Sequence, residues 1–228
     1  MRKILFLAVA LCGLVGFQAC SLDNYDKPSA SLTGALVDSE TNENMPCQYQ
    51  NGSRIRIYEF YNGQWSNQPN DFYTKQDGTF TNNAIFPGKY QIVAEGPFET
   101  LDKVEVEISG ATALELKVIP FLRISANATA TGTSVKMTAN IAQSAGKHAI
   151  KAVEFYCGKT PYVDKNTNDK KEEIDLSGMT DEQIIASTLQ AEFTELKSGS
   201  TLYFRVGALG NNPGNYYNYS KVIEVTIP

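Results

Sequence analysis

Apolar residues at every second position are the feature of this sequence that most limits its fold. Residues 104–108 (VEVEI) and 114–118 (LELKV) each alternate apolar with charged side chains. Successive side chains of a β-strand point to opposite faces, so this period places one face in a core and the other in water. Asn62-Gly63 and Asp77-Gly78, which are typical of tight turns, lie between alternating stretches. The pattern predicts antiparallel β-structure.

After an interruption at Pro120, the second half of the chain repeats this pattern. The alternation returns in four stretches, residues 135–141, 153–157, 202–208 and 223–227. Thr180-Asp181-Glu182-Gln183 is a capping-box sequence, which predicts one short helix on a crossover between strands. Each half has about 100 residues, the size of one domain. We therefore predict an all-β fold of two antiparallel β-sandwich domains in tandem, residues 32–119 and 120–228.

The first twenty residues are typical of a secretory leader that ends at a cysteine. A basic start and an apolar run from Ile4 to Phe17 precede Ala19 and Cys20. The run is about 14 residues long, too short to cross a bilayer, and a small residue at its end is typical of a signal peptide. We predict a signal peptide over residues 1–19, a bacterial lipoprotein lipidated on Cys20, and a tether over residues 20–31. The alternative is an ordinary signal peptide followed by a chance cysteine.

The charge balance excludes two classes of partner. The whole chain has 20 basic and 25 acidic residues, and removal of a leader that holds Arg2 and Lys3 leaves 18 basic residues and a net charge near −7. A surface that binds nucleic acid must be basic enough to displace counterions, so we expect no nucleic-acid partner. Attraction to anionic lipid is excluded for the same reason. The acyl chains on Cys20 are then the predicted link to the membrane.

No residue pattern in the chain points to catalysis. Its single histidine, His148, lies in a polar loop, and no nucleophile-elbow sequence presents a serine for it to activate. Acidic residues such as Glu105 and Glu107 alternate with apolar ones, as in solvated strand faces rather than in the carboxylate pair of a glycosidase. We predict a protein that is not an enzyme, with no catalytic residue and no cofactor, and we interpret His148 as a surface loop residue.

Metal binding and disulfide formation have little support in the sequence. Residues 164–169 carry oxygen-bearing side chains at alternate positions, as in a calcium loop, but Asp169 replaces the glycine that makes the sharp turn. We predict a polar hairpin loop there and no metal site. Cys47 and Cys157 lie in different predicted domains, so we expect Cys47 in a polar loop and Cys157 in a core, unpaired. An oxidising compartment would still permit a bond between them.

Two aromatic clusters in turn-rich segments are the best candidates for ligand binding. Residues 61–73 hold the only tryptophan of the chain, and residues 210–219 hold a second group of tyrosines and asparagines. Aromatic rings can pack on the C–H face of a sugar while amides bond its hydroxyls, and exposed aromatics are costly without a partner. The alternative is structural, with Trp65 closing one end of the first sandwich and the tyrosines packing on the second sheet. The candidate ligand-binding residues are Tyr61, Trp65, Phe72, Tyr73, Tyr216, Tyr217 and Tyr219.

Segments in both halves resemble known domains. Residues 32–46 resemble the opening strand and turn of the carboxypeptidase regulatory-like (transthyretin-like) domain, and residues 77–80 and 86–92 are similar to its most recognisable hairpin. Residues 199–208 resemble the penultimate strand of a fibronectin type III or related immunoglobulin-like module. Leu202 stands where such modules have a corner tyrosine, which favours a divergent sandwich.

Five segments carry a resemblance that extends over the whole chain, namely Cys20, Asp23–Asp26, Gly34–Asp38, Arg54–Glu59 and Tyr219–Ile223. They resemble a Bacteroidetes-type family of lipoproteins of unassigned function, whose genes tend to lie beside SusC/SusD-type nutrient uptake systems, usually for glycans. The resemblance implies a protein of the outer membrane, anchored by lipid and exposed at the cell surface. It also implies the SusC/SusD-type transporter proteins as partners.

Three functions are compatible with these observations. The leading hypothesis is non-catalytic glycan binding in support of a SusC/SusD-type uptake system. The second is a structural spacer or docking subunit of the transporter complex, in which Trp65 and Tyr217 would be buried or would contact protein. The third is a peptide-binding module, because the edge strands of both sandwiches could pair with an extended chain.

Overall fold

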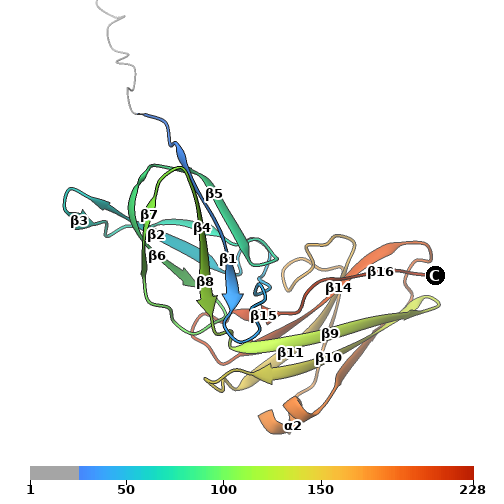
Figure 1. The fold of residues 1–228 in the computed structure, drawn as a ribbon. Coiled ribbons are helices and arrows are strands. Elements are labelled where there is room, and N and C mark those ends of the chain that lie inside the picture. Colours follow the sequence, from blue (N-terminus) through green and yellow to red (C-terminus); the bar gives the residue numbers. More distant parts are fainter. Residues whose placement is uncertain (1–25) are drawn as a thin grey trace, which may run out of the picture.

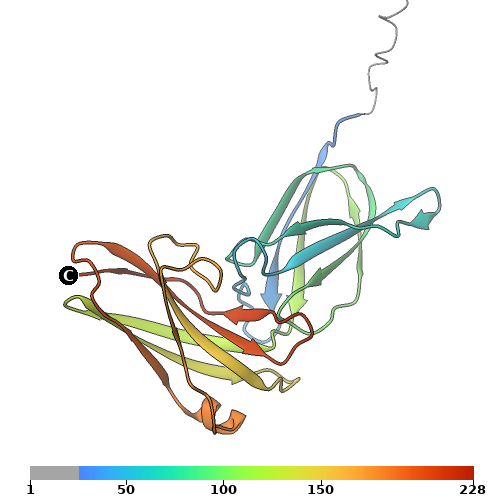
Figure 2. The same ribbon diagram turned by 180° about the vertical axis from the view of Figure 1, so that it is seen from behind.

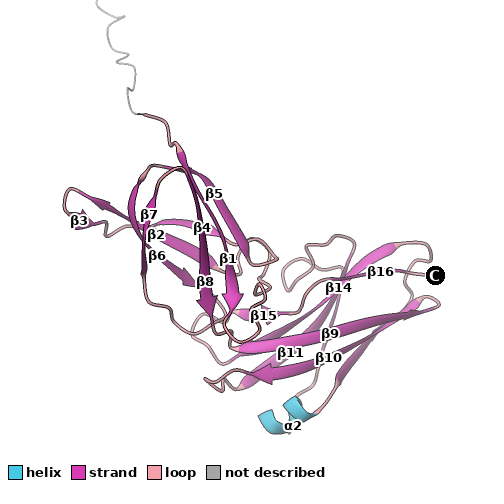
Figure 3. Ribbon diagram, viewed as in Figure 1, coloured by secondary structure: helices cyan, strands magenta, loops and turns pink. Residues whose placement is uncertain are grey.

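The structure is a computed structural model, and it describes residues 26–228. The predicted signal peptide, the predicted lipidation site Cys20 and the first part of the tether lie outside the described residues. Within residues 26–228 the chain forms two β-domains that meet near Pro120 (Figure 3). No helix in this range is long and apolar enough to cross a membrane.

The first domain is a sandwich of two sheets. Its strands are β1 (Ala30–Asp38), β2 (Arg54–Tyr61), β3 (Gln64–Trp65), β4 (Asn70–Tyr73), β5 (Thr79–Ile85), β6 (Gly88–Glu95), β7 (Val104–Ile108) and β8 (Ala111–Val118). One sheet has the order β5-β1-β8 and the other β3-β2-β6-β7, with β4 also pairing on β2. These pairings are antiparallel except that of β1 with β8, which is parallel.

The predicted alternation fills the first core. Ile55 and Ile57 of β2 are buried, while Arg54, Arg56 and Tyr58, which alternate with them, face outward. Gly34 marks the place where β1 passes closest to its neighbours. A Cβ atom there would lie 1.9 Å from the Leu114 carbonyl oxygen and 2.4 Å from the Phe80 ring. Glycine is required because no side chain fits in this space.

The second domain is also a sandwich, followed along the chain from yellow-green to red in Figure 1 and seen from behind in Figure 2. Its elements are β9 (Leu122–Thr131), β10 (Ser134–Gln143), β11 (Ile150–Gly158), β12 (Lys170–Glu173), α2 (Asp181–Ala186), β13 (Leu189–Phe193), β14 (Thr201–Gly210), β15 (Tyr217–Tyr219) and β16 (Ile223–Thr226). One sheet has the order β13-β10-β9 and the other β12-β11-β14-β15, with β16 pairing on β14.

The short helix α2 lies on the crossover from β12 in one sheet to β13 in the other. Its capping box is formed: the Gln183 N–H donates to Thr180 Oγ1 at 3.3 Å, and the Thr180 N–H donates to Gln183 Oε1 at 2.8 Å. Ile184 packs its side chain into the second core. The predictions of two all-β sandwiches and of one short crossover helix are therefore confirmed.

Two features of the arrangement bear on the site. β3 projects from the first domain on the side away from the second domain, as both views show (Figures 1 and 2). β1 begins at the end of the first domain that lies far from the second domain (Figure 1). A membrane anchor preceding β1 would therefore attach to the first domain at its free end.

Candidate functional site

Three aromatic side chains lie together on the outer face of the first domain. Phe60 of β2 is directly opposite Trp65 of β3, and their ring centroids are 4.9 Å apart with an edge-on angle of 60°. Phe60 is 38% exposed and Trp65 is partly exposed. Tyr58 lies two residues before Phe60 and so shares its face, with Lys103 Nζ 3.6 Å from its ring centroid. We call Tyr58, Phe60 and Trp65 the aromatic face.

The other predicted residues of this segment divide between different environments. Tyr73 is opposite Arg54 on β2, so it lies on the same side of the sheet as the aromatic face, and it is 46% exposed. Tyr61 lies at the hairpin tip and is 68% exposed. Phe72 points inward and packs edge-on against Phe80 of the core, with centroids 6.0 Å apart. We therefore leave Phe72 out of the candidate site, because its ring serves the core.

A network of four charged groups continues the aromatic face along β2. Arg56 donates to Glu95 at 2.8 Å and to Asp71 at 3.2 Å, while Arg54 binds the same two carboxylates. Burial would raise the pKa of Glu95, but the hydrogen bonds from both arginines hold it below its ordinary value. The four side chains are thereby fixed and neutralise one another. They present polar atoms beside exposed rings, which is what a sugar with one C–H face and several hydroxyls requires.

The second aromatic cluster has a structural role. Tyr217 and Tyr219 are 6% and 3% exposed, and they pack with Tyr156 and Val163 on the outer side of the second domain's larger sheet. Burial raises the pKa of Tyr217 to about 12, and the nearby carboxylate of Glu154 adds to the effect. Buried rings have no free face for a ligand. We therefore leave Tyr217 and Tyr219 out of the site, in agreement with the structural alternative for these residues.

Tyr216 of the same segment is held by its neighbours. Its N–H donates to Asn212 Oδ1 at 2.9 Å, and its carbonyl accepts from Asn212 Nδ2 at 3.0 Å. The side chain is partly exposed. The Asn212 amide is therefore occupied in bonding the loop itself, and the structure does not bring Tyr216 to the aromatic face.

The alternating pattern does not predict that three polar residues are buried. Glu154, Tyr156 and Arg205 occupy outward positions of β11 and β14, yet they are only 4%, 0% and 0% exposed. The Tyr156 hydroxyl donates to the Glu154 carboxylate. Arg205 donates through Nε to the Ser220 carbonyl and through Nη2 to the Cys47 carbonyl of the first domain, both at 2.9 Å. The cover over this face comes partly from the other domain, which a strand pattern does not encode.

The two domains are joined by several polar bonds. Arg123 of β9 binds Asp38 of β1 through two contacts, at 2.6 and 2.8 Å. Asn218 accepts from the Leu122 N–H and donates to the Pro97 carbonyl. These bonds fix the end of the first domain against β9 and β15.

His148 is part of this junction rather than a plain surface residue, which corrects our prediction. Its Nε2 lies 2.8 Å from Glu99 of the first domain, and its Nδ1 lies 2.9 Å from the Asn211 carbonyl oxygen. Its ring also packs against Phe121, with centroids 4.1 Å apart. The neighbouring residues Ala145, Gly146 and Lys147 stay exposed, so what the sequence did not predict is the contact between His148 and Glu99, which lies 49 positions away.

The loop that resembles a calcium loop is occupied by its own backbone. Asp164 is buried and accepts from the N–H groups of Asn166, Thr167 and, across the junction, Tyr49. Within residues 26–228 no group of three or more His, Cys, Asp or Glu side chains could hold a metal ion. Cys47 and Cys157 are both free thiols. Cys47 lies in a loop, as predicted, but it is fully buried, because its side chain packs in the core of the first domain.

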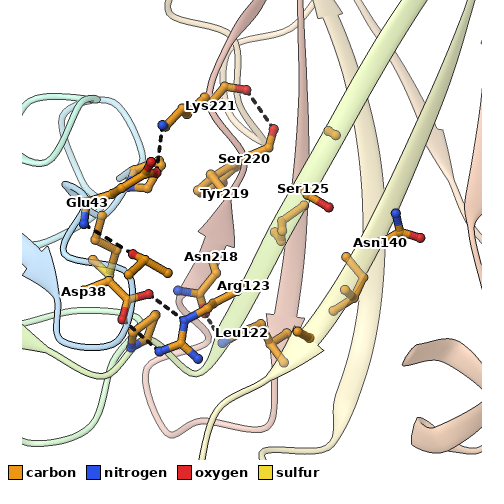
Figure 4. A pocket seen from close by; sticks show the side chains of 18 of the residues that line it. Asp38, Glu43, Leu122, Arg123, Ser125, Asn140, Asn218, Tyr219, Ser220 and Lys221 are labelled. Atoms are coloured by element: carbon orange, nitrogen blue, oxygen red, sulfur yellow. Dashed lines mark hydrogen bonds and ion pairs between the residues drawn. The ribbon is translucent and has the colours of Figure 1, made fainter. Parts of the chain in front are cut away.

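A cleft of about 730 Å³ lies between the β1–β2 connection and strands β9 and β15 (Figure 4). Asp38 and Arg123 on its wall bind each other, and Lys221 reaches Glu43 at 2.8 Å across it. Asn218 is taken up by its two junction bonds. The one aromatic side chain that lines this cleft, Tyr219, is 3% exposed, so the cleft offers no exposed ring and the aromatic face remains the better candidate for ligand binding.

Two family profiles match the chain. One, described as "Protein of unknown function (DUF3823) N-terminal domain", covers residues 30–119. The other, described as "Domain of unknown function (DUF3823_C)", covers residues 122–224. No curated protein matches the chain.

Several solved structures share the fold of this chain. A DUF3823 family protein from Bacteroides uniformis has 23% sequence identity and a TM-score of 0.74, over 88% of this chain and 100% of that one. A DUF3823 family protein from Parabacteroides merdae has 22% identity and a TM-score of 0.73, over 88% and 100%. A second B. uniformis structure is described as a "putative carbohydrate binding protein", with 22% identity and a TM-score of 0.73, over 87% and 99%. At these identities the likeness concerns the fold.

Proposed function

The chain belongs to the DUF3823 family, and we propose that it is a non-catalytic glycan-binding protein whose binding surface is the aromatic face of its first domain. The observation that carries this proposal is the exposed Phe60–Trp65 pair, next to Tyr58 and to fixed charged groups on the same sheet. The description of one B. uniformis relative as a carbohydrate binding protein supports the ligand class.

The shape of the surface favours an extended sugar chain over a small molecule. The aromatic face lies on strands of an open sheet and is not enclosed by a pocket. An aromatic side chain can bury about 150–250 Å² in a contact, and an open surface lets successive sugar units add such contacts. Two or three stacked sugar units therefore give the modest affinity of a capture protein.

The charged groups beside the rings favour binding over hydrolysis. A glycosidase needs one carboxylic acid that is still protonated near neutral pH. Glu95 is the opposite case, because Arg54 and Arg56 hold its pKa below the ordinary value. It accepts hydrogen bonds and is ionised, which suits a ligand contact.

We further propose that the protein is anchored to the outer membrane through lipid on Cys20, exposed at the cell surface, and acts beside a SusC/SusD-type uptake system. The sequence around Cys20 supports the anchor. A chain that enters β1 at the free end of the first domain leaves the β3 hairpin and the second domain clear of the tether (Figure 1).

The test is a glycan array followed by calorimetry with the chain from Ser21 onward, which contains both domains. Trp65→Ala and Phe60→Ala should weaken binding about tenfold each, the equivalent of roughly 1.4 kcal/mol. Ile185→Ala is the control, because Ile185 is an apolar residue with similar exposure (36%) on α2 of the second domain, away from this face. Unchanged affinity in both face variants, or equal loss in the control, would contradict the assignment.

A structural spacer or docking subunit is the second candidate, and the bonded junction favours it. Contacts such as Asp38–Arg123 hold the domains as one unit, as a spacer requires. If no glycan binds, co-purification of the chain with a tagged SusC/SusD-type pair is the next measurement. Association that persists in the Trp65→Ala variant and in the presence of sugar would support the spacer.

A further inference from the structure

A second cleft between the domains, of about 690 Å³, lies beside the one in Figure 4. The first domain contributes Pro46, Lys75 and Gln76, and the second contributes Tyr162, Arg205 and Lys221. Glu43 and Lys221 line both clefts. This second cleft holds aromatic, cationic and apolar groups at one place, and none of the roles described above uses them as a set.

Arg205 at this cleft has an unused bonding group. Its side chain is fully buried, and Nε and Nη2 donate to the carbonyls of Ser220 and Cys47. Nη1 has no partner among the described residues. Asp164, a nearby carboxylate, accepts hydrogen bonds from backbone N–H groups instead. A buried guanidinium without a bonded anion is costly, so an acceptor with negative charge would be stabilised here.

Tyr162 supplies a ring at the opening. It stacks on Tyr49 of the first domain, with centroids 4.3 Å apart and an angle of 28° between the rings. Tyr162 is nevertheless 46% exposed and lines the cleft. One face is thus held by Tyr49 while part of the ring remains free, which is the arrangement that packs against a sugar ring.

The charge of the cleft favours an anion. It is lined by three cations, Lys75, Lys221 and Arg205, against the carboxylates of Glu43 and Asp77. Asp77 already accepts from the Thr79 N–H and hydroxyl, and Glu43 is bound to Lys221. In a chain with a net charge of −5, this is a locally positive place.

We propose that this cleft is a second ligand site, for a sugar that carries a carboxylate, with the sugar ring against Tyr162 and the carboxylate directed to Arg205. The proposal rests on the proposed function only for the class of ligand. Nη1 is buried in this structure, so the proposal requires the exposed Glu43–Lys221 pair, which lines the same cleft, to open and admit the ligand. The cost of opening such a solvated pair is small.

The experiment is calorimetry on the chain from Ser21 onward with three probes. They are an oligogalacturonate, its methyl ester as the neutral match, and a short acidic peptide as an alternative source of carboxylate. We expect the oligogalacturonate to bind more tightly than the ester, with an affinity that falls as salt rises. Tyr162→Ala should weaken it about tenfold, and Ile185→Ala, at an exposed residue outside this cleft, should leave it unchanged.

Several outcomes would overturn the proposal. They are equal affinity for acid and ester, no binding of the acid, loss in Trp65→Ala but not in Tyr162→Ala, or preferential binding of the peptide. Arg205→Lys is a second variant, used only if circular dichroism shows that it folds. It should also lower the affinity for the oligogalacturonate. Failure of the aromatic face is seen separately, as neutral-glycan binding that Trp65→Ala does not affect.

Discussion

Replacing Asp38 with alanine should loosen the domain junction at a measurable cost in stability. The Asp38 carboxylate takes two bonds from Arg123, and its side chain is 8% exposed. Burial alone would raise the pKa of Asp38, but the bonds from Arg123 and the Glu40 N–H hold it below the ordinary value. The folded protein therefore contains an ionised, nearly buried carboxylate, and the variant leaves Arg123 without its main partner.

The magnitude follows from the burial of the two partners. Removing one member of a buried ion pair costs about 3–5 kcal/mol in the free energy of unfolding. Arg123 is 18% exposed and has a second carboxylate, Glu40, at 2.9 Å, so water and Glu40 recover part of the loss. We expect the lower end of the range, about 3 kcal/mol.

Guanidinium denaturation followed by circular dichroism measures this loss. Glu115→Ala is the control, since Glu115 is 69% exposed and 3.8 Å from Lys117, and it should cost less than about 0.5 kcal/mol. Because the pKa of folded Asp38 is depressed, its contribution is present above the unfolded pKa and is lost as pH falls through the folded value. A loss below about 1 kcal/mol for Asp38→Ala would refute the reasoning, because it is the value of a surface pair.

Three further predictions concern single positions. His148→Gln should change how the stability of the protein depends on pH. Partial burial lowers the pKa of His148, but the hydrogen bonds with the Asn211 carbonyl and Glu99 raise it above its usual value. The stability that His148 contributes is therefore present below its unfolded-state pKa and is lost as pH rises through its folded-state pKa. Thermal melts across pH check this, and identical profiles for variant and parent would contradict it. Gly34→Ala should cost about 3 kcal/mol in urea denaturation, at the upper end for overpacking, since its Cβ would meet the Leu114 carbonyl oxygen; an equally stable variant would refute the packing. Burial raises the pKa of the Cys47 thiol and raises that of Cys157 to about 11. A thiol reagent should therefore label neither cysteine until the chain unfolds. Fast labelling of the native chain would contradict this prediction.

The strands and the helix could be predicted because their signals are local. The alternation of Ile55 and Ile57 along β2 is enough to predict that both are buried. The cap of α2 is also local, because Thr180 accepts from the N–H of Gln183, three positions away. Arg205 could not be placed in this way. Its partner Cys47 lies 158 positions earlier in the chain, so its burial depends on how two domains meet. The same holds for His148, whose contact with Glu99 cannot be predicted from its position in a loop.

The candidate site was predicted in part. Trp65 stands out as the only tryptophan in a turn-rich segment, but Tyr58 and Phe60 were missed. Their signal was present, because both are aromatic residues at positions of β2 that alternate with the buried Ile55 and Ile57. What the sequence lacked was the register that sets Phe60 opposite Trp65. An aromatic residue on the polar side of an alternating strand is therefore a more useful sign of a binding surface than an aromatic residue in a loop.

The junction connects the two proposed binding surfaces, and this gives a test that neither surface gives alone. Two weak sites held at a fixed separation bind a long glycan more tightly than either site binds a short one. Asp38→Ala should loosen the junction without touching Trp65 or Tyr162. Because both domains form the second cleft, Asp38→Ala should weaken binding of a short acidic oligosaccharide and, more strongly, of an acidic polysaccharide, as measured by calorimetry on the same preparation. The affinity for a short neutral oligosaccharide at the aromatic face should stay unchanged. A loss for the neutral oligosaccharide would mean that Asp38→Ala damages the aromatic face directly, and no loss for any ligand would mean that the junction does not hold the two surfaces together.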